Sequence, residues 1–117
     1  MAGNRQRRIN GEMQKILADI IRLEMKDPRI SMMTSVLRVD VTNDLSYATA
    51  YISVYDNEEM QKTTIKALEH ALGFLRSEVG KRLNLRKTPE FCIVLDHSME
   101  QSDKISKILN DIGVRDE

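Results

Sequence analysis

Positively charged side chains gather in two short stretches of the chain, and phosphate binding is the chemistry they could support. Several cations within reach of one another can neutralise a nucleic-acid backbone, whose phosphates are closely spaced. Alternatively, their alkyl stems only cover the edges of the core. The N-terminal basic cluster is Arg5, Arg7 and Arg8, and the loop basic cluster is Arg76, Lys81, Arg82, Arg86 and Lys87. We predict that both clusters contact RNA.

Charge is segregated along the sequence, although 18 basic and 18 acidic residues give a formal net charge of zero. Residues 1–35 carry seven bases and four acids, and residues 76–95 carry five bases and two acids. Residues 36–75 and residues 96–117 each carry three bases and six acids. The pattern fits a positive stripe on a neutral body, and it also fits an ordinary mixed surface.

Residues that could act in nucleophilic catalysis are few. Such catalysis needs a serine or cysteine beside a base and an orienting group. The chain has one cysteine, Cys92, and two histidines, His70 and His97. We expect Cys92 to be a packed thiol in a strand and His70 to lie on the polar side of a helix. No GxSxG, Walker or GxGxxG motif occurs.

Metal-ligand residue types occur in residues 96–103. Ser98 followed by Gln101, however, is the pattern of a helix N-terminus. We therefore predict no enzyme activity, no cofactor and no metal site. A small hydrolase that uses Asp96 and His97 remains the rival interpretation.

The three tyrosines share one side of a predicted strand. They are Tyr47, Tyr51 and Tyr55. An aromatic sheet face can stack unpaired bases, but such tyrosines more often cover a sheet with their hydroxyls in water. Whether the stripe contacts RNA stays open.

The length and composition indicate one cytoplasmic domain. A chain of 117 residues with 41% hydrophobic residues can form one modest core. A single cysteine excludes an intrachain disulfide and fits a reducing compartment. No long apolar run suggests a signal peptide or a membrane span.

Helical periodicity predicts the element that follows the N-terminal basic cluster. Apolar residues recur at i, i+4, i+7, i+8, i+11 and i+12 from Ile9 onward. Asn10 is a candidate N-cap, and Asp27-Pro28 should end the helix. Residues 1–8 are then expected to form a flexible arm.

A second helical period precedes the loop basic cluster and runs from Ile65 to Leu83. Gly73 lies inside it, and an interior glycine should bend or split the helix. The glycine would also allow close backbone approach and expose amide groups that attract phosphate. The alternative is a kink that only packing requires.

Period-two alternation predicts three strands, at residues 36–41, 47–55 and 91–95, with a turn at 42–46. A last helix should run from Ser98 to Ile112 and stop at Gly113. The order α-β-β-α-kink-α-β-α predicts an α+β fold with helices packed on one face of a three-stranded sheet.

Four stretches of the sequence together match one known family. They are 12–16 with 26–30, 39–54, 71–77 with Gly80-Lys81 and 83–86, and Pro89-Glu90 with Asp96 and Ser98. Through them the chain resembles the ribosome-binding factor A family over roughly residues 7–112. The resemblance implies a KH-like fold of type II, in which an interhelical kink at Ala71, Leu72 and Gly73 replaces the usual GxxG loop.

The resemblance also implies a function. Members bind the immature 30S small ribosomal subunit, promote late maturation and processing of the 16S rRNA 5′ region, and matter for growth in the cold. The implied mechanism is non-catalytic RNA binding by a monomer, without a membrane or a small-molecule substrate. We expect a flexible arm at 1–8, one RNA-binding domain at 9–113 and a short tail at 114–117. A protein-interaction module that uses the edge of the hairpin is the second rival.

Overall fold

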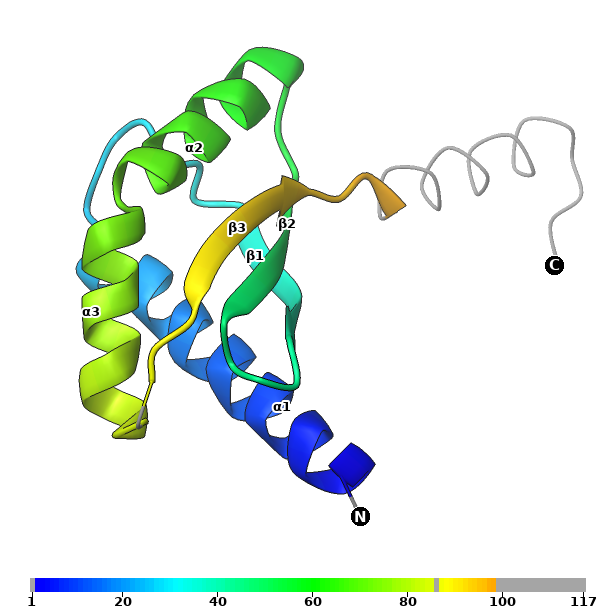
Figure 1. Ribbon diagram of the computed structural model, residues 1–117. Helices are drawn as coiled ribbons and strands as arrows, with labels where there is room; N and C mark the ends of the chain where they lie inside the picture. Colours follow the sequence, from blue (N-terminus) through cyan, green and yellow to red (C-terminus); the bar gives the residue numbers. More distant parts are fainter. Residues whose placement is uncertain (1, 86, 99–117) are drawn as a thin grey trace, which may run out of the picture.

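The computed structural model describes residues 2–85 and 87–98. The element order confirms the predicted α-β-β-α-kink-α-β series (Figure 1). The last predicted helix, from Ser98 to Ile112, lies outside the described residues apart from Ser98. The elements are α1 (Ala2–Asp19), a π-helical turn η1 (Ile20–Glu24), β1 (Thr34–Val41), β2 (Tyr47–Val54), α2 (Glu58–His70), α3 (Leu72–Leu83) and β3 (Glu90–Leu95).

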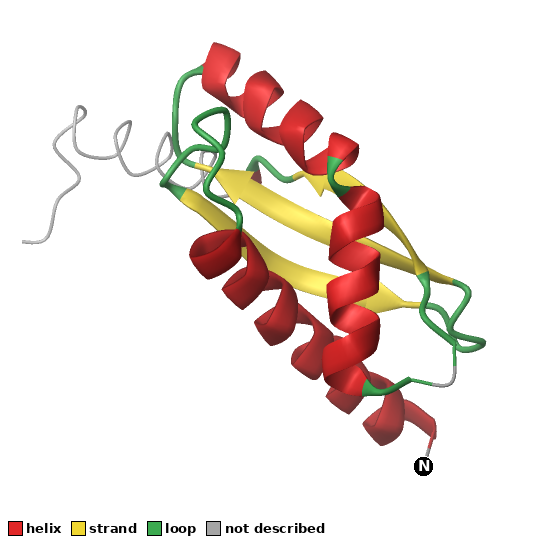
Figure 2. Cartoon of the chain, turned by 90° about the vertical axis from the view of Figure 1, so that its left-hand side faces the viewer, coloured by secondary structure: helices red, strands yellow, loops and turns green. Residues whose placement is uncertain are grey.

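The three strands form one mixed sheet in the order β1-β2-β3. β1 pairs with β2 in antiparallel fashion, and β2 pairs with β3 in parallel, with Ala50 opposite both Val39 and Ile93. Figure 2 shows that α1, α2 and α3 all cover the same face of the sheet. The predicted fold class, with helices on one face only, is therefore confirmed for the described residues.

The core lies between this helical layer and the sheet. The apolar stripe of α1 and the period of α2 and α3 both point into it, because side chains spaced three or four residues apart share one helix face. The largest core side chains with no solvent exposure are Met13, Leu17, Ile20, Ile52, Leu68, Leu75 and Val79.

The expectation of a flexible arm is wrong for residues 2–8, because α1 begins at Ala2. Asn10 is consequently not an N-cap. Its side-chain Oδ1 instead accepts a hydrogen bond from the Val41 amide at 2.9 Å. Gln6 and Gln14 donate side-chain hydrogen bonds to the carbonyls of Val41 and Val36. These amide side chains dock the helix on β1, which explains why it extends beyond its apolar stripe.

The predicted kink lies two residues before Gly73. The change of direction occurs at Ala71, whose amide donates to both Ala67 O and Leu68 O. Gly73 is inside α3, and a Cβ placed on it would meet nothing within 4 Å. Packing therefore does not require a glycine at position 73.

The helix predicted to end at Asp27-Pro28 ends earlier, at Glu24. The Met25 amide bonds to Ile20 O five residues back, which closes the π-helical turn. The chain then leaves the helix and turns at Pro28 and Arg29.

Candidate nucleic-acid interface

One residue of each basic cluster, Arg5 and Lys87, lies at the turn between β1 and β2. Thr42 and Asp44 build this turn, because Thr42 Oγ1 donates to Asp44 Oδ1 at 2.9 Å and accepts from the Ser46 amide at 3.1 Å. The Ser46 amide also donates to Asp44, and this bond lowers the pKa of the Asp44 carboxyl. These hydrogen bonds fix the conformation of the turn, which lies between Arg5 and Lys87.

The N-terminal basic cluster adjoins one side of this turn. Arg5, Gln6 and Ile9 of α1 line a shallow hollow together with Asn43 and Leu45 of the turn. Arg5 and Arg7 are exposed, and within the described part of the chain neither makes an ion pair. Arg8 is exposed and lies 3.8 Å from the Glu12 carboxylate.

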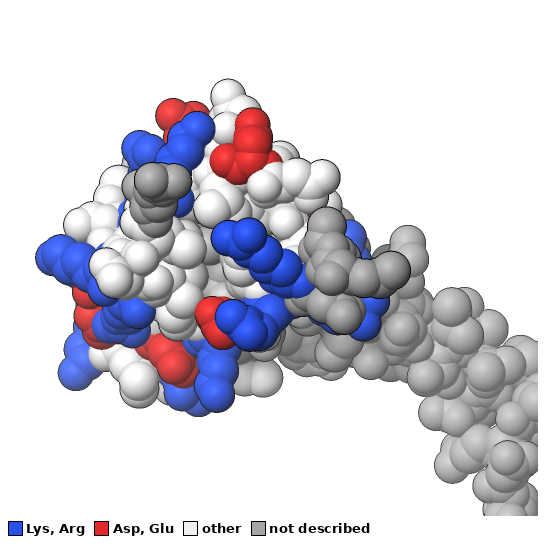
Figure 3. Space-filling model, turned by 60° about the horizontal axis from the view of Figure 1, so that its bottom comes forward, with Lys and Arg blue, Asp and Glu red and all other residues white. Residues whose placement is uncertain are grey.

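The loop basic cluster adjoins the other side of the same turn. Lys87 Nζ donates to Ser46 Oγ at 3.2 Å. In Figure 1 the start of α1, the β1–β2 turn and the loop after α3 all lie at the lower end of the molecule. Figure 3 views this end and shows blue Lys and Arg side chains around it, with a few red acids between them.

Arg76 holds the loop that follows α3. Its Nε and Nη2 donate to Thr88 O at 3.3 and 3.0 Å. Thr88 lies directly over Gly80, where an added Cβ would be only 2.7 Å from Thr88 Oγ1. Gly80 therefore permits the close approach of helix and loop. In the sequence, the only signal at Gly80 was its place in the Gly80-Lys81 pair, which is part of the resemblance to ribosome-binding factor A.

Two members of the loop basic cluster are paired with acids. Arg82 forms ion pairs with Glu24 at the end of η1 and with Glu78, and Lys81 lies 3.4 Å from Glu78. These partners neutralise part of the charge that was predicted to face phosphate. Arg86, the remaining member, lies outside the described residues.

The tyrosine stripe lies on the sheet face that the helices do not cover. Tyr47 and Tyr55 are 59% and 57% exposed. Tyr51 is half-buried, and the Arg38 guanidinium stacks 4.1 Å from the centre of its ring. Arg38 also pairs with Asp40 at 3.3 Å. The Arg38 guanidinium is therefore already bound by Tyr51 and Asp40 of the protein itself.

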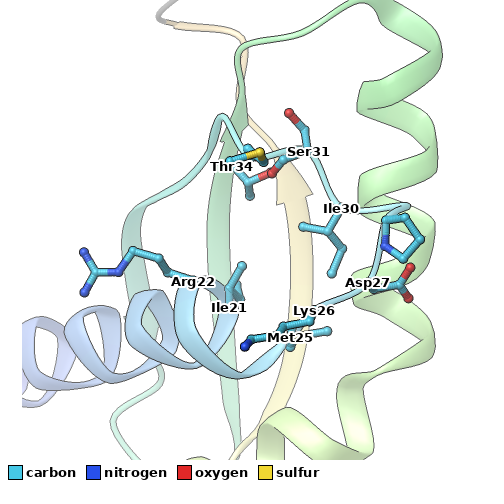
Figure 4. Close-up of a pocket in the computed structure, with 10 residues that line it drawn as sticks. Ile21, Arg22, Met25, Lys26, Asp27, Ile30, Ser31 and Thr34 are labelled. Atoms are coloured by element: carbon cyan, nitrogen blue, oxygen red, sulfur yellow. The ribbon is translucent and has the colours of Figure 1, made fainter.

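A further hollow opens at the other end of the fold, between η1 and the loop before β1 (Figure 4). Its only acid is Asp27, which forms a bidentate pair with Arg29. Hydrogen bonds from Arg29 lower the pKa of the Asp27 carboxyl to about 2. A carboxylate with so low a pKa is a weak base and is almost never protonated near neutral pH, which does not favour general acid–base catalysis.

Asp96 and His97, the residues that the alternative hydrolase interpretation would use, lie directly after β3. Asp96 Oδ1 accepts a hydrogen bond from the Ser98 amide at 2.8 Å. Hydrogen bonding by the Ser98 side chain, together with this amide bond, lowers the pKa of the Asp96 carboxyl. Cys92 is exposed, so the expectation of a packed thiol is wrong: Phe91 and Ile93 face the core, and strand alternation turns Cys92 outward. His70 is exposed, as expected.

Neither a metal-binding cluster nor a membrane-spanning helix is present within residues 2–85 and 87–98. No group of three or more His, Cys, Asp or Glu side chains there could hold a metal ion. None of the helices in that part of the chain is long and apolar enough to cross a membrane.

The β1 edge of the hairpin, proposed for protein recruitment, is occupied at two positions near its ends. Gln6, Asn10 and Gln14 bind backbone groups of β1 at Val36 and Val41. Side chains of α1 therefore use groups that an incoming strand would need, which protects this edge from pairing with another chain.

Comparison with known proteins gives one consistent family. The sequence model of ribosome-binding factor A matches residues 5–109. Ribosome-binding factor A of Clostridium tetani is 47% identical over 112 residues, which cover 96% of this chain and 93% of the relative. The solution structure of a Thermotoga maritima protein is 31% identical, has a TM-score of 0.70 and covers 77% of this chain and 85% of that one.

A lower-identity match has the same fold. It is a homology model of Thermus thermophilus ribosome-binding factor A fitted into a cryo-EM map of a 30S complex, with a TM-score of 0.63 and 20% identity. It covers 75% of this chain and 91% of its own. From the match of its sequence over residues 5–109 and the 47% identity to the clostridial relative, the chain belongs to the ribosome-binding factor A family.

Proposed function

We propose that the protein binds the immature 30S small ribosomal subunit through 16S rRNA and promotes its late maturation. This function includes processing of the 16S rRNA 5′ region, serves growth in the cold and operates in the cytoplasm. Family membership supports the proposal, and so does the relative that was fitted into a 30S complex. The observation that carries it is the position of Arg5 and Lys87, one cation from each basic cluster, at the same turn.

The contact surface is formed by four cations that acids leave unpaired in the described structure. Arg5 and Arg7 come from α1, Arg76 from α3 and Lys87 from the loop before β3. Such a surface binds phosphates, which gives affinity and orientation with little sequence specificity. Arg8 and Lys81 add to this positive potential, although Glu12 and Glu78 partly neutralise them, and Arg82 contributes less because it is paired with Glu78 and with Glu24 at the end of η1.

The mechanism is binding without covalent chemistry. A protein that binds one rRNA conformer more tightly than the others shifts the population toward that conformer. Monomeric protein suffices, because residues of a single chain build the basic surface.

Charge reversal on this surface tests the proposal. The double variant Arg5→Glu, Lys87→Glu removes one cation from each cluster. The matched control, Lys62→Glu with Lys66→Glu, makes the same change in net charge on α2, which lies away from the basic end. Cosedimentation with immature 30S subunits over a series of salt concentrations is the measurement.

We expect the Arg5, Lys87 variant to bind about tenfold more weakly or worse, with a salt dependence reduced by about one to two phosphate contacts. The control should bind like the wild type. Equal binding by wild type and the Arg5, Lys87 variant would contradict the proposed surface. An equal loss in both variants would show that only total charge matters.

A further inference from the structure

The sheet face opposite the helices is uncovered in the described structure and is only partly polar. Register places Arg38, Tyr51 and Val94 in one row across the three strands, and Val94 is 37% exposed. The next row is Asp40, Thr49 and Cys92, with Cys92 exposed. A sheet whose two faces both bear apolar residues normally buries both of them.

The charges on this face do not suit RNA. Asp40 and Glu90 are exposed on it, and the one cation, Arg38, is bound to Asp40 and stacked on Tyr51. Phosphates would be repelled by these acids. A partner that brings apolar side chains fits the face better.

The chain itself leaves the sheet on this side. After Leu95, residues 96–98 turn away from the helical layer (Figure 1). The Asp96 amide donates a hydrogen bond to Ile52 O at 2.8 Å, which keeps Asp96 next to the paired Tyr51 and Val94. The exit of the chain is therefore beside the Arg38, Tyr51 and Val94 row.

The sequence that follows has the complementary pattern. Residues 99–117 contain an apolar stripe at i, i+3, i+4 and i+7, formed by Ile105, Ile108, Leu109 and Ile112. Lys104 flanks this stripe, whereas Lys107 and Asn110 would lie on the opposite side of such a helix. A helix over 99–112 would be about 21 Å long, close to the roughly 20–27 Å of strands with six to eight residues. So short a helix is marginal in water unless its stripe is buried.

We propose that residues 99–112 fold as a helix onto the open sheet face, over the Tyr51, Cys92 and Val94 side chains. The occupant of this face is thus the chain's own C-terminal segment, which completes a helix–sheet–helix sandwich. The proposal goes beyond the rRNA contact and is independent of it, because the two surfaces share no residue.

Cys92 is a built-in reporter, because it is the chain's single cysteine and lies on the face in question. The experiment measures the rate at which a disulfide reagent modifies Cys92 in the full-length protein. The test variant Ile105→Glu, Ile108→Glu disrupts the stripe. The control Asn110→Glu adds a charge on the opposite side of the predicted helix.

We expect Cys92 of the test variant to react about tenfold faster than Cys92 of the wild type. In the wild type the reagent reaches the thiol only when the C-terminal helix detaches from the sheet, whereas in the variant the thiol is already exposed. The control should react at the wild-type rate. The thermal midpoint of each variant shows whether the domain remains folded; a globally unfolded test variant is replaced by Leu109→Gln, for which the same rise is expected.

Two outcomes overturn the proposal. One is a wild-type rate equal to that of the urea-unfolded chain, which would mean that the face is open. The other is protection that disappears on dilution, which would mean that a second copy covers the face.

Discussion

Lys87 donates a hydrogen bond from Nζ to Ser46 Oγ across 41 positions of sequence. This contact joins the loop before β3 to the β1–β2 turn, whose other side adjoins Arg5. An exposed hydrogen bond of this kind stabilises the fold little. Its importance is positional, because it places a loop cation beside the cluster on α1.

Arg82 should matter more for stability than its neighbour Lys81. Arg82 pairs with Glu24 and Glu78 and so connects α3 to η1, whereas Lys81 is 72% exposed. Arg82→Ala should lower the free energy of unfolding by about 0.5–1 kcal/mol, and Lys81→Ala by less. Urea unfolding measures both. If Arg82→Ala leaves stability unchanged but weakens subunit binding, Arg82 is a phosphate ligand instead.

The two glycines of α3 should respond differently to alanine. Gly73→Ala should raise the free energy of unfolding by about 0.5–1 kcal/mol, since alanine is the better helix former and the site has room. Gly80→Ala should be less stable than Gly73→Ala by about 1 kcal/mol or more, because its Cβ would collide with Thr88 Oγ1.

Thermal and urea unfolding of the two glycine variants give the comparison. Thr88→Ala should restore the alanine benefit at position 80, since it removes the colliding atom. No rescue would show that the loop backbone, not Thr88 Oγ1, opposes the added methyl group. Gly73→Ala with normal stability and weakened subunit binding would indicate that rRNA approaches the backbone at Gly73.

Thr64 anchors the loop between η1 and β1. It is fully buried, accepts from the Ser31 amide at 3.0 Å and donates to Arg29 O at 3.3 Å. Thr64→Val keeps the shape but leaves both groups unpaired, so it should cost about 1–3 kcal/mol. The adjacent Thr63→Val is the control and should stay within about 0.5 kcal/mol. Similar values for both variants would contradict this anchoring role.

Asp27 should contribute to stability at neutral pH and lose that contribution in acid. Its folded-state pKa of about 2 is below the ordinary value of 3.8, so folding favours the ionised form. The contribution is complete above the ordinary value and disappears as pH falls through about 2. Asp27→Asn should therefore lower the thermal midpoint at pH 6 and have a much smaller effect at pH 2.

Carboxyl titration by NMR checks the cause of this shift. Arg29→Gln removes the hydrogen-bond donor that holds the carboxylate, so the Asp27 midpoint should move up toward 3.8. A midpoint that stays near 2 in this variant would show that other groups set the pKa.

Local patterns were sufficient for most of the fold. The strand at Tyr47–Val54 and the helix stripes that place Met13, Leu68 and Val79 in the core follow from periods of two and 3.6 residues. Errors occurred where a tertiary contact outweighed a local signal. Asn10 is a good N-cap residue, yet it binds Val41, and the helix continues past it to Ala2.

The amino-acid sequence by itself determined the order of the elements, the two apolar layers and the existence of two basic clusters, because these depend on residue type and short-range spacing. Only the tertiary structure decided that Arg5 and Lys87 adjoin the same turn, that Glu24 pairs with Arg82 and that Cys92 faces outward. Such relations depend on strand register and helix placement, which bring together residues that no local period connects.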